Sequence, residues 1–587
     1  MYRLLAILAC CGAAMAQTPP PHSVFDQDTV HEIRLRFDNA DWFQVLTDNY
    51  DGVRAENPYF PASIEWGPYK FDNIGVRFKG NSSYNSSRTQ KKPFRIKLNE
   101  FVKGQKIEGL ASFGLSNGWN DPSYVREKPY YELAAKLGMK APRSSYAALY
   151  INDEYWGLYI LGEVVNGDFL TNYFGKNEDK GNLYKGNIGA TFAYLGEDKQ
   201  AYKNVWEKQS NEDADDWSDL IALTKLIDDT PAADLAAKLD PIMDIDSVLT
   251  ALALDNATVN LDSYAGMGQN FNIYRRPSDN KWVWIPWDPS LAFGALSQGQ
   301  TQQGMIELPL EWSNTGGGFG GGGFPPGGLP PGGLPPGGLP PGGLPPGGGQ
   351  GGQNIPAGRP LATKLWENPQ YRERYRQIYQ QLMERVFRPE EVLARMNALR
   401  DMIRPWVQQE TKALATFEQF EAAMTTPITN TPVTPGGGQP GQPGQPGQGG
   451  GQGGPGGGSA PGLQPFIEGR TAWVNTKLAE SSVPALALSA DTSGIALELN
   501  GSTANKQTVA LTISGNAVPA SYSLRAVTDN GGEWLVLNVS GGSIPGSFVV
   551  SPSASSLSAG TYTATIYVYS QGAANSPLAI PVTLTRK

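Results

Sequence analysis

Two carboxylates and an amide stand close together in residues 255–294, on sequence that is typical of β-strands. Asp262 lies in NLDSY, Asn270 begins NFNIY, and Asp288 ends the Trp-rich run KWVWIPWD. Carboxylate and amide oxygens, with no histidine nearby, suit a hard cation such as Mg²⁺, which usually serves a phosphate-bearing substrate. The spacing alone also allows the two acids to cap turns, so the metal site is a hypothesis that needs the elements around it.

Those elements predict how the three residues meet. NFNIY and KWVWIPW are rich in β-branched and aromatic residues, and a polar, turn-like segment, residues 275–280, separates them. This pattern predicts a β-hairpin. The hairpin returns Asp288 towards Asp262 and Asn270. Two carboxylates that are buried together without a cation repel each other, so we expect the pKa of one to rise.

A small polar loop between two predicted strands is a second candidate for phosphate binding. Residues 71–98 read as strand, loop and strand, and the loop offers main-chain N–H groups to an anion, those of Gly80, Asn81 and Ser82. In the second strand, apolar and basic residues alternate, so Lys97 points away from the core. Lys92 precedes this strand. A solvated basic edge explains both lysines equally well.

Two further segments position charged residues. Residues 117–138 predict a helix with Asp121 as its cap, Pro122 in its first turn and a kink at Pro129. Residues 146–165 predict a largely buried hairpin, and Glu163 lies among its apolar residues. A buried carboxylate needs a partner, which a structural salt bridge would also supply.

The motifs, taken in their order along the chain, resemble those of the CotH kinase family, the spore-coat protein H-like atypical protein kinases. The resemblance covers about residues 28–480 and rests on RFKGNSS, KKPFRIKL, SNGWNDPSYVREK, LYINDEYWGLYILGEVV and NLDSY…NFNIY…WVWIPWD…AFG. It implies an α+β, atypical protein-kinase-like domain. It also implies phosphate transfer from ATP, with Mg²⁺ or Mn²⁺, to Ser or Thr of a protein substrate.

The resemblance also implies roles for individual residues. Asp262 orients or deprotonates the acceptor hydroxyl, and Asp288 and Asn270 hold the metal. The nucleotide-binding residues that it implies are Gly80, Asn81, Ser82, Lys92 or Lys97, and Glu163, with Glu127 as a partner of the lysine. Ser290 stands where family members often carry a second acid, which argues against a second metal ion.

Two Gly/Pro-rich insertions interrupt the predicted domain, at about residues 316–358 and 432–461. Their composition cannot pack a core. Amphipathic helical sequence resumes after each, so we expect both to be excursions from one domain.

From residue 482 to 587, short β-rich runs alternate with Gly, Ser and Asn turns, which predicts an all-β, immunoglobulin-like sandwich. The run resembles the BACON domain, a bacterial module. That resemblance implies attachment to surface carbohydrate or a role as a spacer.

The N-terminus and the composition narrow the function. Residues 1–16 read as a signal peptide, with a lipid anchor at Cys10 or Cys11 as the alternative, so we expect a secreted or cell-surface protein without a transmembrane segment. His22 and His31 are the two histidines of the chain, which excludes a Ser-His-Asp triad in its body. A net charge of −9 disfavours a nucleic-acid partner.

A non-catalytic surface or adhesion protein is the alternative function. CotH-like proteins also occur as adhesins, and a BACON-like module with Gly/Pro-rich excursions suits a cell surface. The joint presence of Asp262, Asn270 and Asp288 favours the kinase.

Overall fold

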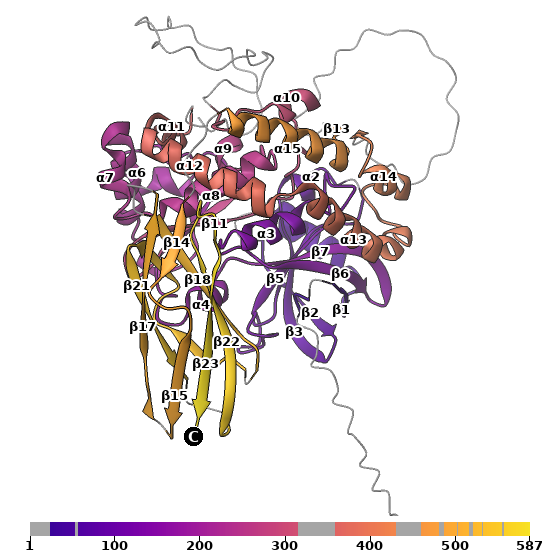
Figure 1. Ribbon diagram of the computed structural model, residues 1–587. Coiled ribbons are helices and arrows are strands. Elements are labelled where there is room, and N and C mark those ends of the chain that lie inside the picture. Colours follow the sequence, from indigo (N-terminus) through magenta and orange to yellow (C-terminus); the bar gives the residue numbers. More distant parts are fainter. Residues whose placement is uncertain are drawn as a thin grey trace, which may run out of the picture.

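The computed structural model describes residues 24–26, 28–52, 57–87, 89–314, 358–429, 459–480, 486–501, 503–515, 520–530, 532–553 and 557–587. The predicted signal peptide and nearly all of both Gly/Pro-rich insertions lie outside these ranges. The described part mixes helices and strands, as expected (Figure 1). Within it, no helix combines the length and the apolar character that crossing a membrane requires.

The N-terminal part forms a closed barrel with the strand order β1-β2-β3-β4-β5-β7-β6. Alternating apolar residues fill it; Phe94 and Ile96 are fully buried, whereas Lys97 points outward. Helices α1 (Trp42–Asp51) and α2 (Ser82–Asn85) accompany it. The strands are β1 (Val30–Arg36), β2 (Phe60–Trp66), β3 (Tyr69–Phe78), β4 (Phe94–Lys97), β5 (Ser112–Ser116), β6 (Ser144–Ile151) and β7 (Glu154–Glu163).

A four-stranded sheet with the order β11-β10-β8-β9, here called the central sheet, carries the predicted hairpin. Its strands are β8 (Leu183–Gly186), β9 (Trp206–Lys208), β10 (Phe271–Arg275) and β11 (Trp282–Pro286). The expected antiparallel pairing of β10 with β11 is confirmed. Phe271 stacks on Trp284 with ring centroids 4.3 Å apart, on the sheet face that belongs to the main core.

Helices surround the central sheet and complete that core (Figure 1). Helix α3 joins it to the barrel, and α8 leads into the segment with Asp262. The helices are α3 (Glu127–Lys136), α4 (Gly167–Phe174), α5 (Lys199–Lys203), α6 (Ser218–Asp229), α7 (Leu235–Leu239), α8 (Ile245–Ala257), α9 (Tyr264–Met267), α10 (Gln302–Ile306), α11 (Pro360–Glu367), α12 (Pro369–Gln381), α13 (Pro389–Gln408), α14 (Phe417–Ala422) and α15 (Leu463–Ala479), with the short turns η1 (Glu212–Ala214), η2 (Ala232–Asp234) and η3 (Leu382–Val386).

The chain flanking each insertion returns to the place that it left. The backbone N–H of Asn314 donates to the carbonyl of Ala265, and Arg359 donates to the carbonyl of Tyr264 at 2.7 Å. Around the second insertion, β12 (Ile428–Thr429) pairs with β13 (Ser459–Ala460) in an antiparallel ribbon. Strand β13 already lies inside the expected second insertion, which therefore rejoins the fold slightly earlier than predicted.

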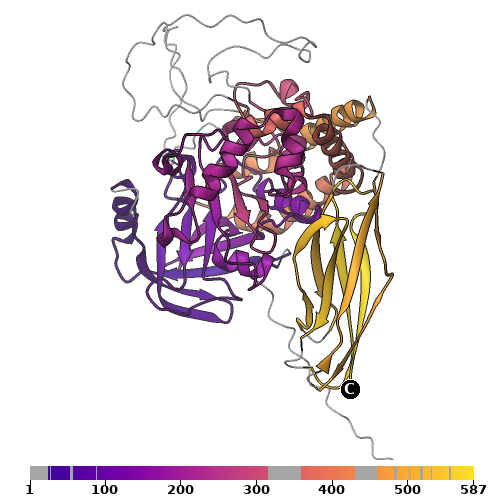
Figure 2. The ribbon, with the colours of Figure 1, turned by 90° about the vertical axis from the view of Figure 1, so that its left-hand side faces the viewer.

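The C-terminal residues form two sheets around one apolar core, with the orders β14-β17-β21-β19 and β16-β15-β23-β22-β18-β20. They lie beside the helical part in both views (Figures 1 and 2). The strands are β14 (Ala487–Ala490), β15 (Ile495–Asn500), β16 (Thr503–Ala504), β17 (Gln507–Ser514), β18 (Ala520–Thr528), β19 (Leu535–Leu537), β20 (Gly541–Ile544), β21 (Gly546–Pro552), β22 (Gly560–Tyr569) and β23 (Leu578–Arg586).

Polar contacts fasten these two sheets to the rest of the chain. Ser521, in β18, donates its backbone N–H to Asp246 at 2.8 Å and its hydroxyl to Asp244 at 2.7 Å. Asp246 also accepts two hydrogen bonds from Arg374, at 2.9 and 2.7 Å. Since Asp244 caps α8 and Asp246 lies in its first turn, the C-terminal sheets hold the start of the helix that leads to Asp262.

Candidate active site

The structure brings Asp262, Asn270 and Asp288 to one place. Asn270 donates its amide N–H to the Asp262 carboxylate and to the Asp262 carbonyl, both at 2.9 Å. Gln269 donates to the other carboxylate oxygen of Asp262 at 2.5 Å. These bonds fix the orientation of Asp262 and leave the Oδ1 oxygen of Asn270 as its atom for binding a cation.

Asp288 reaches the same place from the end of β11. Its backbone adopts the left-handed conformation, with φ of 48°, and its N–H donates to the hydroxyl oxygen of Tyr131 at 3.0 Å. The hydroxyl of Ser290 donates to its carboxylate at 2.7 Å. Asp288 is exposed, so its carboxylate is accessible to a ligand.

The two carboxylates repel each other, as expected from the sequence. Burial and then the charge of Asp288 raise the pKa of Asp262 to about 7. A divalent cation would remove this repulsion, and the donor set of carboxylate and amide oxygens fits Mg²⁺. Among the described residues, no three His, Cys, Asp or Glu side chains form a complete metal cage.

Lys79 is the cation that the structure places beside these acids. Phe78, the last residue of β3, is buried inside the barrel, so Lys79 leaves the barrel on the outer side. Its Nζ donates to the Ser116 hydroxyl at 3.1 Å. Burial lowers the pKa of Lys79, and the nearby carboxylates of Asp288 and Glu127 act in the opposite direction.

Glu127 completes the cluster from the first turn of α3. Its side chain is buried, and its Oε2 has no hydrogen-bond partner among the described residues. Burial and then the charge of Asp288 raise the pKa of Glu127 to about 8, while Lys79 lowers it. Helix α3 also carries Tyr131, so the helix holds Glu127 and the Asp288 backbone together.

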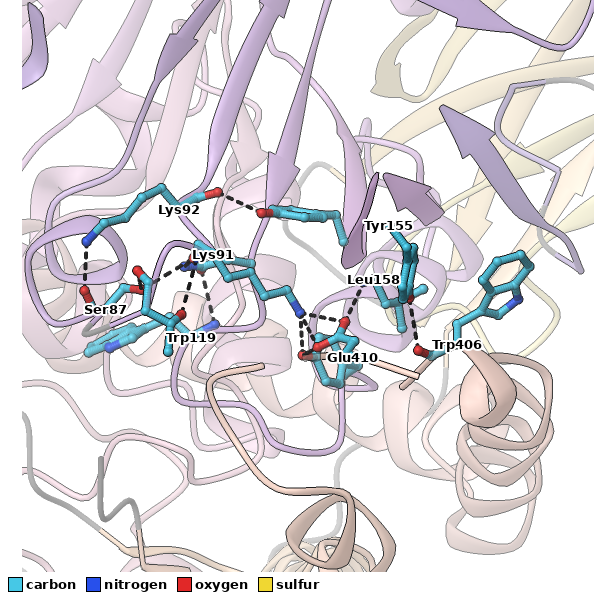
Figure 3. Close-up of polar contacts among 12 residues, drawn as sticks. Ser87, Lys91, Lys92, Trp119, Tyr155, Leu158, Trp406 and Glu410 are labelled. Atoms are coloured by element: carbon cyan, nitrogen blue, oxygen red, sulfur yellow. Dashed lines mark hydrogen bonds and ion pairs between the residues drawn. The ribbon is translucent and has the colours of Figure 1, made fainter. Parts of the chain in front are cut away.

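The two lysines named from the sequence have other partners. Lys92 donates to the carbonyl of Ser87 at 2.7 Å (Figure 3) and to that of Tyr84 at 2.9 Å, and so closes the end of α2. Lys97 pairs with Glu100 at 2.7 Å. Lys79, rather than Lys92 or Lys97, is thus the lysine whose pKa Asp288 and Glu127 influence, and the nucleotide contact expected of Lys92 or Lys97 stays a prediction.

Lys91, the neighbour of Lys92, belongs to a separate buried ion pair. Its Nζ lies 2.7 Å from the Glu410 carboxylate, both side chains have 0% exposure, and the pair joins the barrel to the chain after α13 (Figure 3). Tyr124 accepts a hydrogen bond from the same Nζ at 2.6 Å. This pair fixes the barrel against the helices.

The predicted phosphate loop directly follows Lys79. Gly80 has φ of 85°, a conformation that favours glycine, and its carbonyl accepts a hydrogen bond from the Tyr50 hydroxyl. Asn81 precedes α2, which begins at Ser82. The loop thus starts at the lysine of the cluster, which places Gly80, Asn81 and Ser82 next to it in the chain.

Glu163 has the salt bridge that the sequence offered as its alternative role. Its carboxylate accepts two hydrogen bonds from the Arg143 guanidinium, at 3.1 and 2.8 Å, and one from Tyr173 at 3.2 Å. A Cβ on the preceding residue, Gly162, would lie 3.6 Å from the Glu127 carboxylate. Because successive strand residues point to opposite faces, Glu163 is turned away from the Lys79 cluster.

Comparisons with known proteins identify the family to which the chain is related. The family model described as "CotH kinase protein" matches residues 76–430. Invasin CotH3 of Rhizopus delemar is 25% identical over 38% of this chain and 38% of its own length. The inner spore coat protein H of Bacillus subtilis is 24% identical over 41% of this chain and 64% of its own length. The chain thus spans about one third to two thirds of the curated relatives that it matches.

Among solved structures, a Bacteroides ovatus GH5 xyloglucanase matches 17% of this chain and 19% of its own, at 18% identity and a TM-score of 0.14. This likeness is too small to assign a fold.

Proposed function

The chain belongs to the CotH kinase protein family, and we propose that it is a secreted or surface-located, Mg²⁺-dependent kinase that transfers the γ-phosphate of ATP to Ser or Thr of a protein. Family membership confirms the relationship expected from the motifs. The kinase-like fold, the nucleotide and the protein acceptor are parts of the proposal.

One observation supports it: Asp288 is linked electrostatically to Asp262, to Glu127 and to Lys79, which come from separate segments. Lys79 comes from the barrel, Glu127 from α3, and Asp262 and Asp288 from the two sides of the β10–β11 hairpin. A cation next to carboxylates that repel each other is the arrangement that binds a metal–phosphate group. Phosphoryl transfer depends mainly on such positioning and neutralisation of charge.

Each residue has a role in this mechanism. Asp288 and the Oδ1 of Asn270 would hold Mg²⁺, which supplies neutralisation of the phosphate charge when bound. Lys79 binds phosphate oxygens, Glu127 holds Lys79 in position, and the loop from Gly80 adds main-chain N–H groups.

Asp262 acts on the acceptor. In the free protein burial, and then the charge of Asp288, raise its pKa to about 7, and a cation at Asp288 would favour the ionised carboxylate that a general base requires. It takes the proton of the Ser or Thr hydroxyl while that oxygen bonds to the γ-phosphorus. The bond from the γ-phosphorus to the bridging oxygen breaks, and ADP leaves with the electron pair.

Incubation of the full chain with γ-labelled ATP, Mg²⁺ or Mn²⁺ and a Ser-rich acceptor protein tests the proposal. We expect label on the acceptor that is lost on chelation of the metal and in Asp262→Asn. Transfer that persists in Asp262→Asn would assign the reaction to another protein in the preparation.

A non-catalytic surface or adhesion protein is the second candidate, and the names of relatives as invasins and a spore coat protein favour it. The two C-terminal sheets, which enclose one core, support the proposed sandwich, and a BACON-like role at surface carbohydrate is part of this second candidate. Titration with Mg²⁺ and ATP separates the two functions. Absence of nucleotide binding would favour the function of a non-catalytic surface or adhesion protein.

A further inference from the structure

A buried amide on the central sheet has no partner for either of its polar atoms. Asn272, in β10, is 1% exposed, and neither its Nδ2 nor its Oδ1 has a hydrogen-bond partner among the described residues. An unsatisfied buried polar group costs about 1–3 kcal/mol. An amide that lacks partners on both atoms therefore indicates a ligand that satisfies them.

The sheet register places this amide next to the candidate active site. Asn272 lies opposite Ile285 of β11 on one side and opposite Lys185 of β8 on the other. Its neighbours Phe271 and Ile273 belong to the main core, so Asn272 lies on the other face of the sheet, with Lys185 and Ile285. On the same strand pair, Asp288 follows Ile285 by three residues.

Lys79 connects this face to the barrel. Burial chiefly lowers the pKa of Lys79, and the charge of Lys185 adds a lesser contribution in the same direction, which puts Lys185 within electrostatic range of Lys79. A Cβ on Gly114, in β5 of the barrel, would lie 3.3 Å from the Lys79 Nζ. The region of Asn272 and Lys185 therefore lies near the outer face of β5.

The outer face of the barrel lacks side chains at this point. Gly114 lies directly opposite Gly162 in the pairing of β5 with β7. Both positions face the cluster, because a Cβ on Gly162 would lie 3.6 Å from the Glu127 carboxylate. The two paired glycines let the Lys79 side chain and the Glu127 carboxylate approach the barrel backbone closely, so the charged groups of the site lie against this face.

We propose that Asn272 recognises the base of the bound nucleotide and makes the site selective for adenine. This inference rests on the proposed function. A side-chain amide presents one acceptor and one donor side by side, which matches the N6 amino group and N7 of adenine. Guanine presents two acceptors, O6 and N7, on the same edge and cannot pair with both amide atoms. Ile285, which packs in the apolar cluster with Phe169 and Phe174, makes the surroundings of the amide apolar on one side, and Lys79 receives the phosphates.

Binding by the full chain of Mg-ATP, Mg-GTP and inorganic tripolyphosphate tests this role. In Asn272→Leu, which keeps the volume and removes the amide, we expect ATP affinity to fall about tenfold and the preference for ATP over GTP to disappear. Tripolyphosphate affinity stays unchanged, because it lacks a base. The melting temperature of the free protein rises, because the unsatisfied amide is gone.

Thr250→Val is the matched control. Thr250 is fully buried in α8, and its hydroxyl also lacks a hydrogen-bond partner among the described residues. Removal of this hydroxyl is expected to raise the melting temperature of the free protein without changing its affinity for ATP or for GTP. Asn272→Ala repeats the test with a smaller side chain.

The outcomes distinguish a failure of this inference from a failure of the proposed function. If the parent chain binds ATP and Asn272→Leu and Asn272→Ala keep its ATP-to-GTP ratio, the inference alone is overturned, and an internal water satisfies the amide. If the parent chain binds neither ATP nor tripolyphosphate, the proposed function is overturned together with it.

Discussion

Asp262, on one side of the β10–β11 hairpin, has its pKa raised by its own burial and then by the charge of Asp288, at the end of β11. The pKa of Asp262 thereby reaches about 7 from its ordinary 3.8. The pair is thus unfavourable in the free protein, which makes the site one that gains from a bound cation.

This repulsion predicts how stability depends on pH. Between pH 4 and 7 the folded protein holds a proton on Asp262 that the unfolded chain has released, so the free energy of unfolding falls as pH rises through this window. Asp262→Asn removes the effect. Above pH 7 we expect the variant to be more stable by about 2 kcal/mol, after allowance for solvent around this partly buried group. Urea unfolding at pH 4.5 and 8 measures it, and an equal effect of the substitution at both pH values would contradict the assignment.

Asp288→Asn tests the metal site. The exposed carboxylate of Asp288 is the main anionic ligand that we assign to the cation, so its loss is expected to abolish Mg²⁺-dependent ATP binding while the fold stays intact. Calorimetric titration with ATP at fixed Mg²⁺ provides the measurement. Asp279→Asn, in the turn of the same hairpin, is the control and is expected to bind as the parent does. Parent-like Mg-ATP affinity in Asp288→Asn would show that the site assignment is wrong.

Lys79→Met distinguishes the lysine of the cluster from those favoured by the sequence. Removing a positive group that faces the phosphates typically lowers the rate about 100-fold or more. Lys97→Met removes an equal charge from β4 of the same barrel, where its partner is Glu100, and is expected to change the rate less than about twofold. Initial rates of label transfer compare the two. A larger loss in Lys97→Met than in Lys79→Met would restore the assignment made from the sequence.

Local patterns predict the hairpin and the strand faces, because the register of β10 with β11 and the alternation in β4 depend on neighbours in sequence. The choice of lysine depends on closure of the barrel, a long-range property that sequence spacing does not reveal. The lone lysine of RFKG, directly before a glycine, was the available signal for Lys79.

The start of α3 also differs from the prediction. Asp121 accepts N–H bonds from Ser123 and Arg126, and the helix begins at Glu127. Pro129 therefore lies in the first turn, where proline is tolerated, rather than at a kink.

Removal of the first Gly/Pro-rich insertion is expected to leave the domain folded. Asn314 and Arg359, which lie on either side of the insertion, both bind the segment 264–266, so a short link can join them. Replacing residues 316–357 with a Gly-Ser link should change the melting temperature by no more than about 2 °C, because no packed core is lost. Loss of a cooperative transition in thermal melts would show that the insertion is structural.

The contact between Asp246 and Arg374 predicts the strongest effect on stability. Both side chains are 1% exposed, and Asp246 accepts bonds from Arg374 and from Ser521 of the C-terminal sheets. Asp246→Ala leaves the Arg374 guanidinium buried without its counter-ion, which typically costs about 3–5 kcal/mol.

Glu311→Ala is the matched control, because Glu311 pairs at 2.8 Å with Arg376, on the same helix as Arg374, but both side chains are partly exposed. We expect that pair to contribute less than about 1 kcal/mol. Because Asp246 also holds Ser521, its loss is expected to release the C-terminal sheets before the rest of the chain unfolds. Limited proteolysis of Asp246→Ala should therefore cut within residues 481–485 faster than in the parent, whereas Glu311→Ala should not. Equal cleavage rates in all three proteins would show that the C-terminal sheets are held by other contacts.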